Sequence, residues 1–185
     1  MSGALVLVGL SGSGKSTVGR LVASRLRLSF VDTDRQVELL AGMSIAAIFS
    51  QLGEDEFRRR EGAVVAEACE KRGIVATGGG AVLSAENRAA MRTDNLVVWL
   101  DVPISILAKR LAGHAQGEER PLLGADDPFV RLECLSRERR AVYRASAHVR
   151  CAVREDAPSG SRRIAVDLAR IYRAWFTAER NVDES

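Results

Sequence analysis

Several residue types are scarce in this chain of 185 residues, and each scarcity excludes a class of protein. Two histidines and three widely spaced cysteines, Cys69, Cys134 and Cys151, offer neither a zinc cluster nor a disulfide framework. Aromatic residues make up only 5% of the chain, and they are not interleaved with basic runs as in proteins that bind nucleic acid. No apolar run approaches the roughly 20 residues that span a membrane. We therefore expect a cytoplasmic protein that binds neither nucleic acid nor membrane.

Lysine is also scarce, because arginine accounts for 24 of the 27 basic residues. The net charge is +3, and the arginine side chain binds anions through paired N–H groups. Small anionic substrates explain this charge better than a polynucleotide does. A hydrophobic fraction of 46% is enough for one sizeable core, so we expect residues 1–185 to form a single domain. We also expect a monomer.

The most informative segment is 9–17, GLSGSGKST, which follows the apolar run 4–8. It fits the pattern G-x-x-x-x-G-K-[S/T] between a short strand and a helical pattern. Glycines let the backbone turn its N–H groups toward phosphate, and the following helix adds the positive end of its dipole. We expect Lys15 to reach the β- and γ-phosphates of a nucleotide and the Ser16 hydroxyl to ligate Mg²⁺. The segment predicts a phosphate-binding loop in preference to a turn that binds nothing.

Two carboxylates, Asp32 and Asp34, follow the second predicted strand, 28–31. Ligands of open α/β sheets bind at the carboxyl ends of the strands. Asp32 is therefore a candidate for the Mg²⁺ shell, directly or through water. Asp34 is a candidate to orient or deprotonate an acceptor hydroxyl, and the sequence leaves both roles open. One of the two can instead be only the N-cap of a helix predicted over 35–41.

Three consecutive glycines, Gly78 to Gly80, follow the third predicted strand, 73–77. Glycine is costly in backbone entropy, so such a run indicates a close approach of the backbone to a phosphate or a sugar-like ring, in preference to a wide turn. On the preceding predicted helix, 54–71, Phe57, Arg58 and Glu61 share one side. That side suits a small molecule with a carboxylate, although an arginine-rich helix is more often simply solvated.

The polar segment 112–127 is long for a loop within a compact domain, which is typical of a functional lid rather than a plain surface loop. Arg120, beside Pro121, is placed to neutralise phosphate charge in a transition state. Asp101 ends another predicted strand and resembles a metal-binding acid, but with Asp32 available we interpret it as structural or capping.

The remaining pattern alternates short apolar strands with helices, which predicts an α/β fold of three layers with a central parallel sheet of about five strands. We expect the last helix to cover 162–176 and the tail to be frayed from about 177. Predicted strands are 4–8, 28–31, 73–77, 95–101 and 149–153; the other predicted helices are 15–26, 35–41, 45–51, 54–71, 84–91, 103–111 and 128–146.

From Leu5 to about Ala165 the chain resembles the shikimate kinase family, which belongs to the nucleoside-monophosphate-kinase-like P-loop folds. The combination and order of several motifs carry the resemblance. These are the Walker A loop, Asp32-Thr33-Asp34, Ser44-Ile45-x-x-Ile48-Phe49, Gly53-Glu54-x-x-Phe57-Arg58-x-x-Glu61, Gly78-Gly79-Gly80-Ala81-Val82, Arg120-Pro121-Leu122-Leu123 and Arg139-x-x-x-Tyr143.

The resemblance implies ATP-dependent phosphorylation of the 3-hydroxyl of shikimate, a step of aromatic amino-acid biosynthesis, with Mg²⁺ as the metal. It implies a substrate-binding helical region at about 33–61 and a mobile lid at about 112–124. The implied catalytic residues are Lys15, Asp34 and Arg120. The implied ligands are, for shikimate, Asp34, Arg58, Gly79 and Arg139; for ATP, Gly12, Ser13, Gly14, Lys15, Ser16, Thr17, Arg110 and Arg120; and for the metal, Ser16 and Asp32.

The family commonly has a proline between the arginine and the tyrosine of its last motif, whereas this chain reads Arg139-Arg140-Ala141-Val142-Tyr143. The sequence therefore leaves open whether Arg139 or Arg140 faces the substrate. Two other functions also stay open. One is a related kinase that acts on gluconate or a cyclitol, and the other is a nucleotide-binding regulatory protein without transferase activity.

Overall fold

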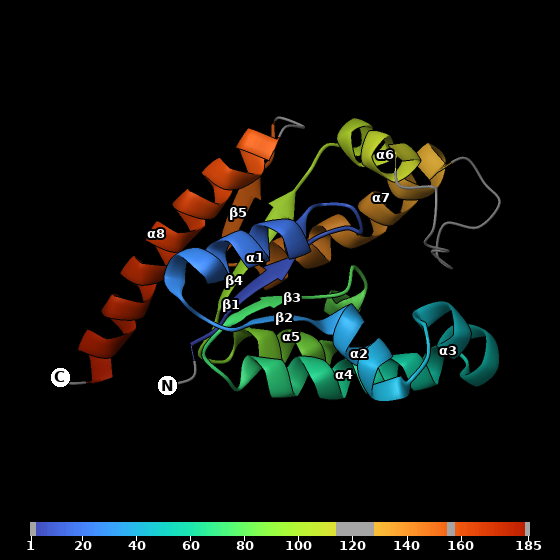
Figure 1. Ribbon diagram of the computed structural model, residues 1–185, viewed down its shortest axis with the longest axis horizontal. Coiled ribbons are helices and arrows are strands. Elements are labelled where there is room, and N and C mark those ends of the chain that lie inside the picture. Colours follow the sequence, from blue (N-terminus) through green and yellow to red (C-terminus); the bar gives the residue numbers. More distant parts are fainter. Residues whose placement is uncertain (1–2, 114–127, 155–157, 184–185) are drawn as a thin grey trace.

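A parallel five-stranded sheet forms the centre of the molecule, in the order β2-β3-β1-β4-β5 (Figure 1). This computed structural model describes residues 3–113, 128–154 and 158–183. The strands are β1 (Leu5–Val8), β2 (Phe30–Asp32), β3 (Ile74–Ala76), β4 (Leu96–Asp101) and β5 (Val149–Ala152). The predicted parallel sheet of about five strands is confirmed.

Helices connect the strands and cover both faces of the sheet, which gives the predicted three layers (Figure 1). They are α1 (Lys15–Leu26), α2 (Thr33–Ala41), α3 (Ile45–Leu52), α4 (Glu54–Cys69), the short 3₁₀ helix η1 (Ala81–Leu83), α5 (Ala85–Arg92), α6 (Ile104–Gly113), α7 (Pro128–Ser146) and α8 (Pro158–Asp183).

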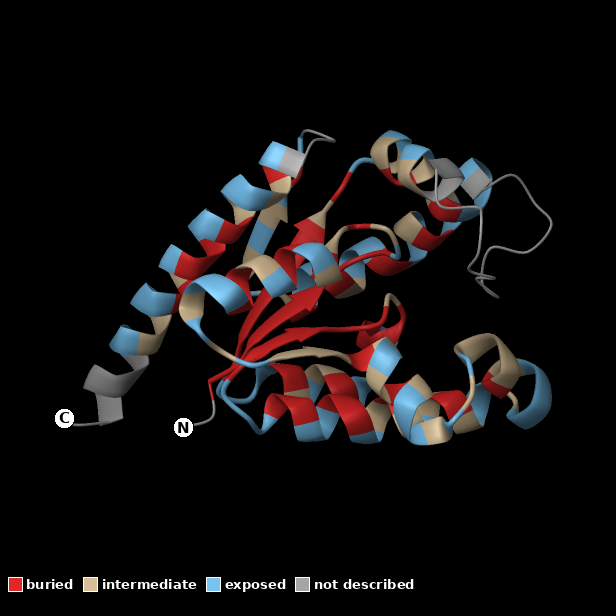
Figure 2. Ribbon diagram, in the orientation of Figure 1, coloured by how far each residue is buried: buried red, intermediate tan, exposed pale blue. Residues whose placement is uncertain are grey.

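The three inner strands β3, β1 and β4 are buried on both faces, and alternate residues pack into opposite cores (Figure 2). Leu5 and Leu7 pack with residues of α1 and α8, whereas Val6 and Val8 pack with residues of α4, α5 and α7. Side chains of a strand alternate between faces, so a continuous apolar run supplies both cores at once. The short apolar run before the glycine loop thereby fixes that loop firmly at the carboxyl edge of the sheet.

A smaller apolar cluster holds α2 and α3 against α4, away from the sheet (Figure 1). Its buried members are Val37, Ile48, Phe57 and Val64. The Ser44 hydroxyl accepts a hydrogen bond from the Ala47 N–H and caps α3, as its position before an apolar helix predicts. Most of the segment 33–61 is therefore helical, and an apolar cluster of its own packs its helices together.

The last helix is longer at both ends than the predicted 162–176, because α8 covers Pro158–Asp183. The Tyr172 hydroxyl donates to the Gly3 carbonyl oxygen, and the Arg72 guanidinium lies 4.2 Å from the centre of the Phe176 ring. The apolar stripe ends at this ring, which explains the prediction, but the helix continues through a segment that includes the good helix formers Ala178, Glu179 and Arg180. Within the described ranges, no helix combines the length and the apolar character needed to cross a membrane.

Candidate active site

The glycine-rich loop between β1 and α1 has the backbone shape that its sequence predicts. Gly9, Gly12 and Gly14 have φ angles of 147°, 81° and 87°, a region that favours glycine, and Gly14 is the N-cap of α1. The Lys15 ammonium donates to the carbonyl oxygens of Gly9 (2.8 Å) and Leu10 (2.9 Å). A buried ammonium and the amino end of a helix therefore meet at one loop, which is suited to binding an anion.

Ser16 and Asp32 form a pair of oxygen ligands beside this loop. The Ser16 hydroxyl donates to Asp32 Oδ2 at 2.5 Å, while Asp32 Oδ1 accepts from the Arg35 N–H at 3.4 Å and caps α2. Asp32 is therefore the N-cap of α2, one of the two roles that the sequence left open, and it also pairs with Ser16; its role in the Mg²⁺ shell stays a prediction. A hydroxyl and a carboxylate suit Mg²⁺, which keeps several of its waters and needs few protein ligands. Accordingly, no cluster of three or more His, Cys, Asp or Glu side chains gathers among the described residues.

Asp34 lies in the first turn of α2, against the triple glycine. A Cβ on Gly78 would clash with Asp34 Oδ1 and would lie 2.7 Å from Glu61 Oε1, so only glycine fits between these carboxylates. The Gly78 N–H is fixed by the Thr33 hydroxyl at 3.0 Å. Burial raises the pKa of Asp34 to about 6; Lys15 acts in the opposite direction, and the charge of Glu61 adds to the increase. The sequence predicted that the backbone at these glycines lies close to a phosphate or a sugar-like ring. In the structure, the groups that lie close to Gly78 are two acidic side chains.

Arg58 and Glu61, on the inner side of α4, form a short ion pair beside this acid. Arg58 Nη1 donates to Glu61 Oε2 at 2.7 Å, and the Glu61 side chain is only 1% exposed. Burial raises the pKa of Glu61, while the charge of Arg58 acts against that increase. Among the described residues Glu61 Oε1 has no hydrogen-bond partner, which is unusual for a buried carboxylate. Such an oxygen is available to a ligand or to water.

Arg139 and Tyr143, on α7, both reach the glycine loop from the other side. Arg139 Nη1 and the Tyr143 hydroxyl donate to the Gly79 carbonyl oxygen at 3.1 Å and 2.6 Å. Arg139 is buried, and its Nε has no hydrogen-bond partner among the described residues. Arg58 and Arg139 therefore approach the same three glycines from two different helices.

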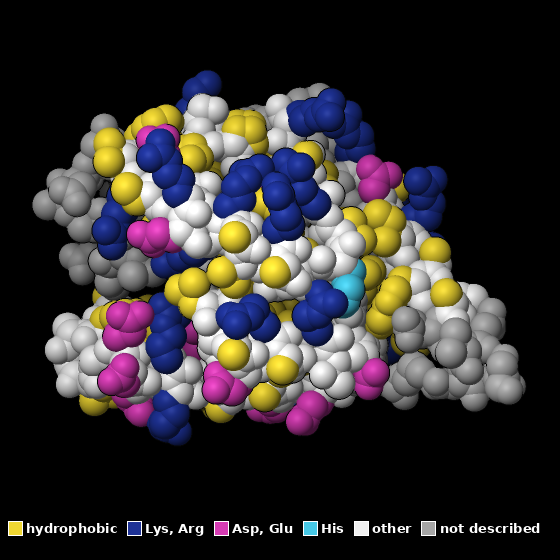
Figure 3. All heavy atoms as spheres, turned by 180° about the vertical axis from the view of Figure 1, so that it is seen from behind, with side chains coloured by type: hydrophobic (Ala, Val, Ile, Leu, Met, Phe, Trp, Pro, Cys, Tyr) yellow, Lys and Arg dark blue, Asp and Glu magenta, His cyan; other side chains and the backbone are white. Residues whose placement is uncertain are grey.

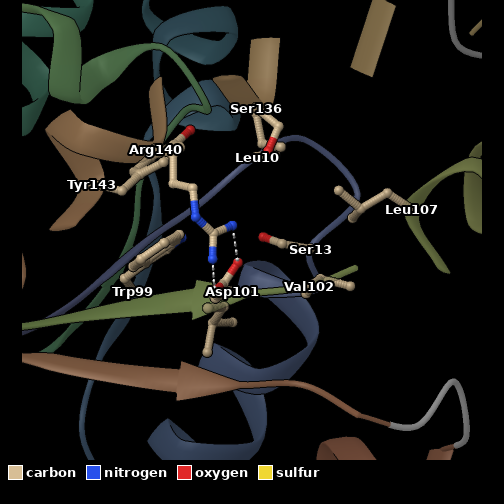
Figure 4. Close-up of a pocket in the computed structure, with 10 residues that line it drawn as sticks. Leu10, Ser13, Trp99, Asp101, Val102, Leu107, Ser136, Arg140 and Tyr143 are labelled. Carbon is tan, nitrogen blue, oxygen red and sulfur yellow. Dashed lines mark hydrogen bonds and ion pairs between the residues drawn. The ribbon is translucent and has the colours of Figure 1, made fainter. Parts of the chain in front are cut away.

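Arg140, by contrast, points away from the glycines, because successive residues of a helix face directions about 100° apart. It extends past Trp99 to Asp101 (Figure 4). Asp101 also pairs with Arg150. Of the two arginines, Arg139 is the one that lies at the glycine loop, which favours it as the substrate ligand. Asp101 serves as the common partner of two arginines, as the structural interpretation of this residue anticipates.

The phosphate loop and the triple glycine are in contact. A Cβ on Gly79 would lie 3.1 Å from the Ser11 backbone nitrogen and 3.7 Å from the Gly9 carbonyl oxygen. Arg110, on α6, lies on another side of the phosphate loop, where its Nη1 donates to the Gly12 carbonyl oxygen at 3.1 Å. A molecule held at the triple glycine and a phosphate chain held by Lys15 would therefore be neighbours.

The sequence did not identify three of the contacts that shape this site. These are the Thr33 hydroxyl on Gly78, the Tyr143 hydroxyl on Gly79, and a second carboxylate on Arg58, that of Glu54. Only the last has a local signal, since Glu54 precedes Arg58 by four residues on a helix. Arg120 and most of the predicted lid lie outside the described residues.

Some of the basic side chains outside the site pair with acids. On the rear face, Lys and Arg side chains occur in several groups with acidic side chains nearby (Figure 3). On α7, the exposed Arg137 pairs with Glu133 at 2.8 Å, and Arg140 pairs with Asp101 at 3.2 Å. These contacts agree with the interpretation of the arginine-rich helix as mostly a solvated surface.

A family model, curated relatives and a solved structure that resemble this chain all carry the same family name. The family model described as shikimate kinase matches residues 11–171. Similar curated relatives include a shikimate kinase of Symbiobacterium thermophilum, 52% identical over 79% of this chain and 84% of its own length, and one of Thioalkalivibrio sulfidiphilus, 40% identical over 91% and 86%. A solved shikimate kinase from Acinetobacter baumannii, in complex with shikimate, superimposes with a TM-score of 0.83 at 34% identity over 93% of both chains. The chain belongs to the shikimate kinase family.

Proposed function

We propose that this protein transfers the γ-phosphoryl group of ATP to the 3-hydroxyl of shikimate. The observation that carries the proposal is the convergence of Asp34, Arg58 and Arg139 on a glycine loop that touches the phosphate loop. Shikimate offers hydroxyls and a carboxylate, which match one acid and two guanidinium groups. The similar structure from Acinetobacter baumannii holds shikimate, which supports the choice of acceptor.

On the acceptor side, Arg58 and Arg139 bind the carboxylate, the backbone at Gly79 contacts the ring substituents, and Asp34 binds the hydroxyls. With a pKa of about 6, Asp34 is mostly ionised at neutral pH but is more basic than an ordinary aspartate. That value suits a general base, because proton acceptance is most effective near the working pH. We therefore propose that Asp34 both orients the attacking hydroxyl and accepts its proton.

On the nucleotide side, Gly12, Ser13, Gly14, Lys15, Ser16 and Thr17 hold the phosphates, and Arg110 lies toward the adenine. Ser16 and Asp32 hold Mg²⁺, which when bound neutralises charge on the phosphate oxygens. Lys15 then exchanges its loop carbonyl partners for phosphate oxygens. Arg120, which lies outside the described residues, adds positive charge over the transferred group.

ATP and shikimate are the only two reactants that the transfer requires. The 3-hydroxyl oxygen forms a bond to the γ-phosphorus, the bond from that phosphorus to the bridging oxygen of ADP breaks, and Asp34 takes up the hydroxyl proton. Positioning and charge neutralisation by Lys15 and the arginines supply most of the rate enhancement. We further propose that the protein acts as a monomer in the cytoplasm.

The deciding experiment is coupled ADP release with Mg-ATP and shikimate, beside gluconate and a reaction without acceptor. Release that depends on shikimate is expected, and Asp34→Ala or Arg58→Ala should abolish it while ATP binding persists. Release with gluconate alone would favour the related sugar-acid kinase, which the shikimate kinase relatives argue against. Turnover in either variant near that of the native protein would refute the assigned residue roles.

A further inference from the structure

The Arg58 guanidinium already pairs with two carboxylates of its own helix. Its Nη1 donates to Glu61 Oε2 at 2.7 Å, and its Nε and Nη2 donate to Glu54 Oε1 at 3.2 Å and 3.1 Å. Each of its three nitrogens therefore has an acidic partner. The inference drawn from this contact rests on the proposed function, in which Arg58 binds the carboxylate of the acceptor.

The glycine loop closes another side of the same guanidinium. A Cβ on Gly80 would lie 2.7 Å from Arg58 Nη1 and 2.9 Å from Nη2, so these nitrogens fill the space that a side chain at position 80 would take. The edge formed by Nε and Nη2 can bind a carboxylate through two parallel bonds, and Glu54 already occupies that edge. An acceptor carboxylate that binds there has to take the place of Glu54.

The two glutamates differ strongly in how firmly they are held. Glu61 is 1% exposed and makes a single short bond, and moving it would leave a charge buried. Glu54 is 59% exposed and shares one oxygen between two longer bonds. An exposed ion pair on a helix contributes little free energy, because water solvates its partners when they separate. Glu54 is the partner that can leave.

We propose that Glu54 is a specificity-determining residue, a placeholder carboxylate that the carboxylate of the acceptor replaces on Arg58. In the free protein Glu54 keeps the Nε and Nη2 edge of the guanidinium in a geometry suited to a carboxylate. An anionic acceptor restores a charge-assisted contact when it displaces Glu54. A neutral polyol does not, and exchanging the carboxylate for a hydroxyl leaves the arginine with a weaker partner.

The proposal is tested with Glu54→Gln, which keeps the size of the side chain and removes its charge. Asp55→Asn is the matched control, because Asp55 is exposed in the same helical turn, and among the described residues Arg58 pairs with Glu54 and Glu61 rather than with Asp55. We expect Glu54→Gln to lower the KM for shikimate by about two- to fivefold, the effect of an exposed ion pair. We expect kcat and the KM for ATP to stay unchanged, and calorimetric titration of shikimate without nucleotide to show the same gain in affinity.

Three results would overturn the proposal. A higher KM for shikimate in Glu54→Gln would mean that Glu54 positions Arg58 instead of competing for it. An unchanged KM would mean that the contact does not oppose binding, and an equal decrease in Asp55→Asn would mean that only the general charge of the helix matters. Absence of shikimate turnover in the native protein would instead reject the proposed function, which keeps the two failures distinct.

Discussion

The phosphate loop and the acceptor side of the site are built in different ways. The phosphate loop is one continuous segment, 9–17, whose backbone shape depends on three glycines with positive φ. The acceptor side gathers side chains from α2, α4 and α7, and residues as far apart as Asp34 and Arg139 meet at three glycines. The first region is organised by backbone conformation and the second by buried charge.

This difference determines how each region tolerates change. A loop of backbone donors binds any phosphate chain of the right size, so its selectivity lies in the few side chains it carries. A site made of buried charges holds each ion through its partners, and removal of one partner leaves another uncompensated. Mutations should therefore act locally in the phosphate loop and through pairs on the acceptor side.

After the loss of turnover expected of Asp34→Ala and Arg58→Ala, the next largest effect is expected on the nucleotide side. Lys15→Met removes the ammonium expected to stabilise the transferred phosphoryl group, and we expect kcat to fall by about 10²- to 10³-fold. Lys109→Met is the matched control, since Lys109 is exposed on α6, and its kcat should stay within about twofold of native. Steady-state ADP release measures both. Comparable losses in the two variants would contradict a special role for Lys15.

An intermediate effect should distinguish neighbouring arginines on the acceptor side. Arg139→Lys keeps the charge but loses the planar fork at the glycine loop, and we expect the KM for shikimate to rise by about 10- to 100-fold. Arg140→Lys changes only a half-exposed pair with Asp101, so its KM should change by less than about twofold. The KM for ATP should remain native in both. The reverse ranking would show that the wrong arginine had been assigned to the substrate.

The smallest expected effect is on stability. Asp34 has a pKa of about 6 in the folded protein against 3.8 as the ordinary value, so its ionised form destabilises the fold, fully above pH 6 and progressively less toward pH 4. Asp34→Asn should therefore raise the free energy of unfolding at pH 7 by on the order of 1–2 kcal/mol, partly offset by the lost charge in the first turn of α2. Urea denaturation at pH 7 and pH 4.5 measures the gain, which should shrink at the lower pH. Equal gains at both pH values would show that burial of the charge is not its cause.

The fold was predictable because its signals are local. Apolar runs such as 4–8 and 95–101 specify buried parallel strands, and the glycine-rich loop specifies the strand-to-helix turn. The sequence underestimated α8, whose last turns have helical propensity but no apolar stripe. The last turns of α8 therefore depend on local helical propensity and not on burial of apolar side chains.

The acceptor side was predictable only in part, because its decisive contacts join distant segments. The motif around Arg139 does not say which of two adjacent arginines turns inward, and the helical phase that decides it comes from the packing of α7. Nothing near Gly78 in the sequence points to the Thr33 hydroxyl, 45 residues earlier. Helical spacing could have predicted the contact between Glu54 and Arg58, but the same spacing of an acid and an arginine is common on exposed helix surfaces.

The doubly bonded carbonyl of Gly79 has a consequence for the design of inhibitors. The Tyr143 hydroxyl and the Arg139 guanidinium occupy both lone pairs of this oxygen, so the peptide between Gly79 and Gly80 cannot turn over without losing two donors. Because the peptide is planar, the Gly80 N–H points away from α7. An inhibitor therefore cannot donate a hydrogen bond to the Gly79 carbonyl oxygen without displacing the Arg139 or the Tyr143 donor.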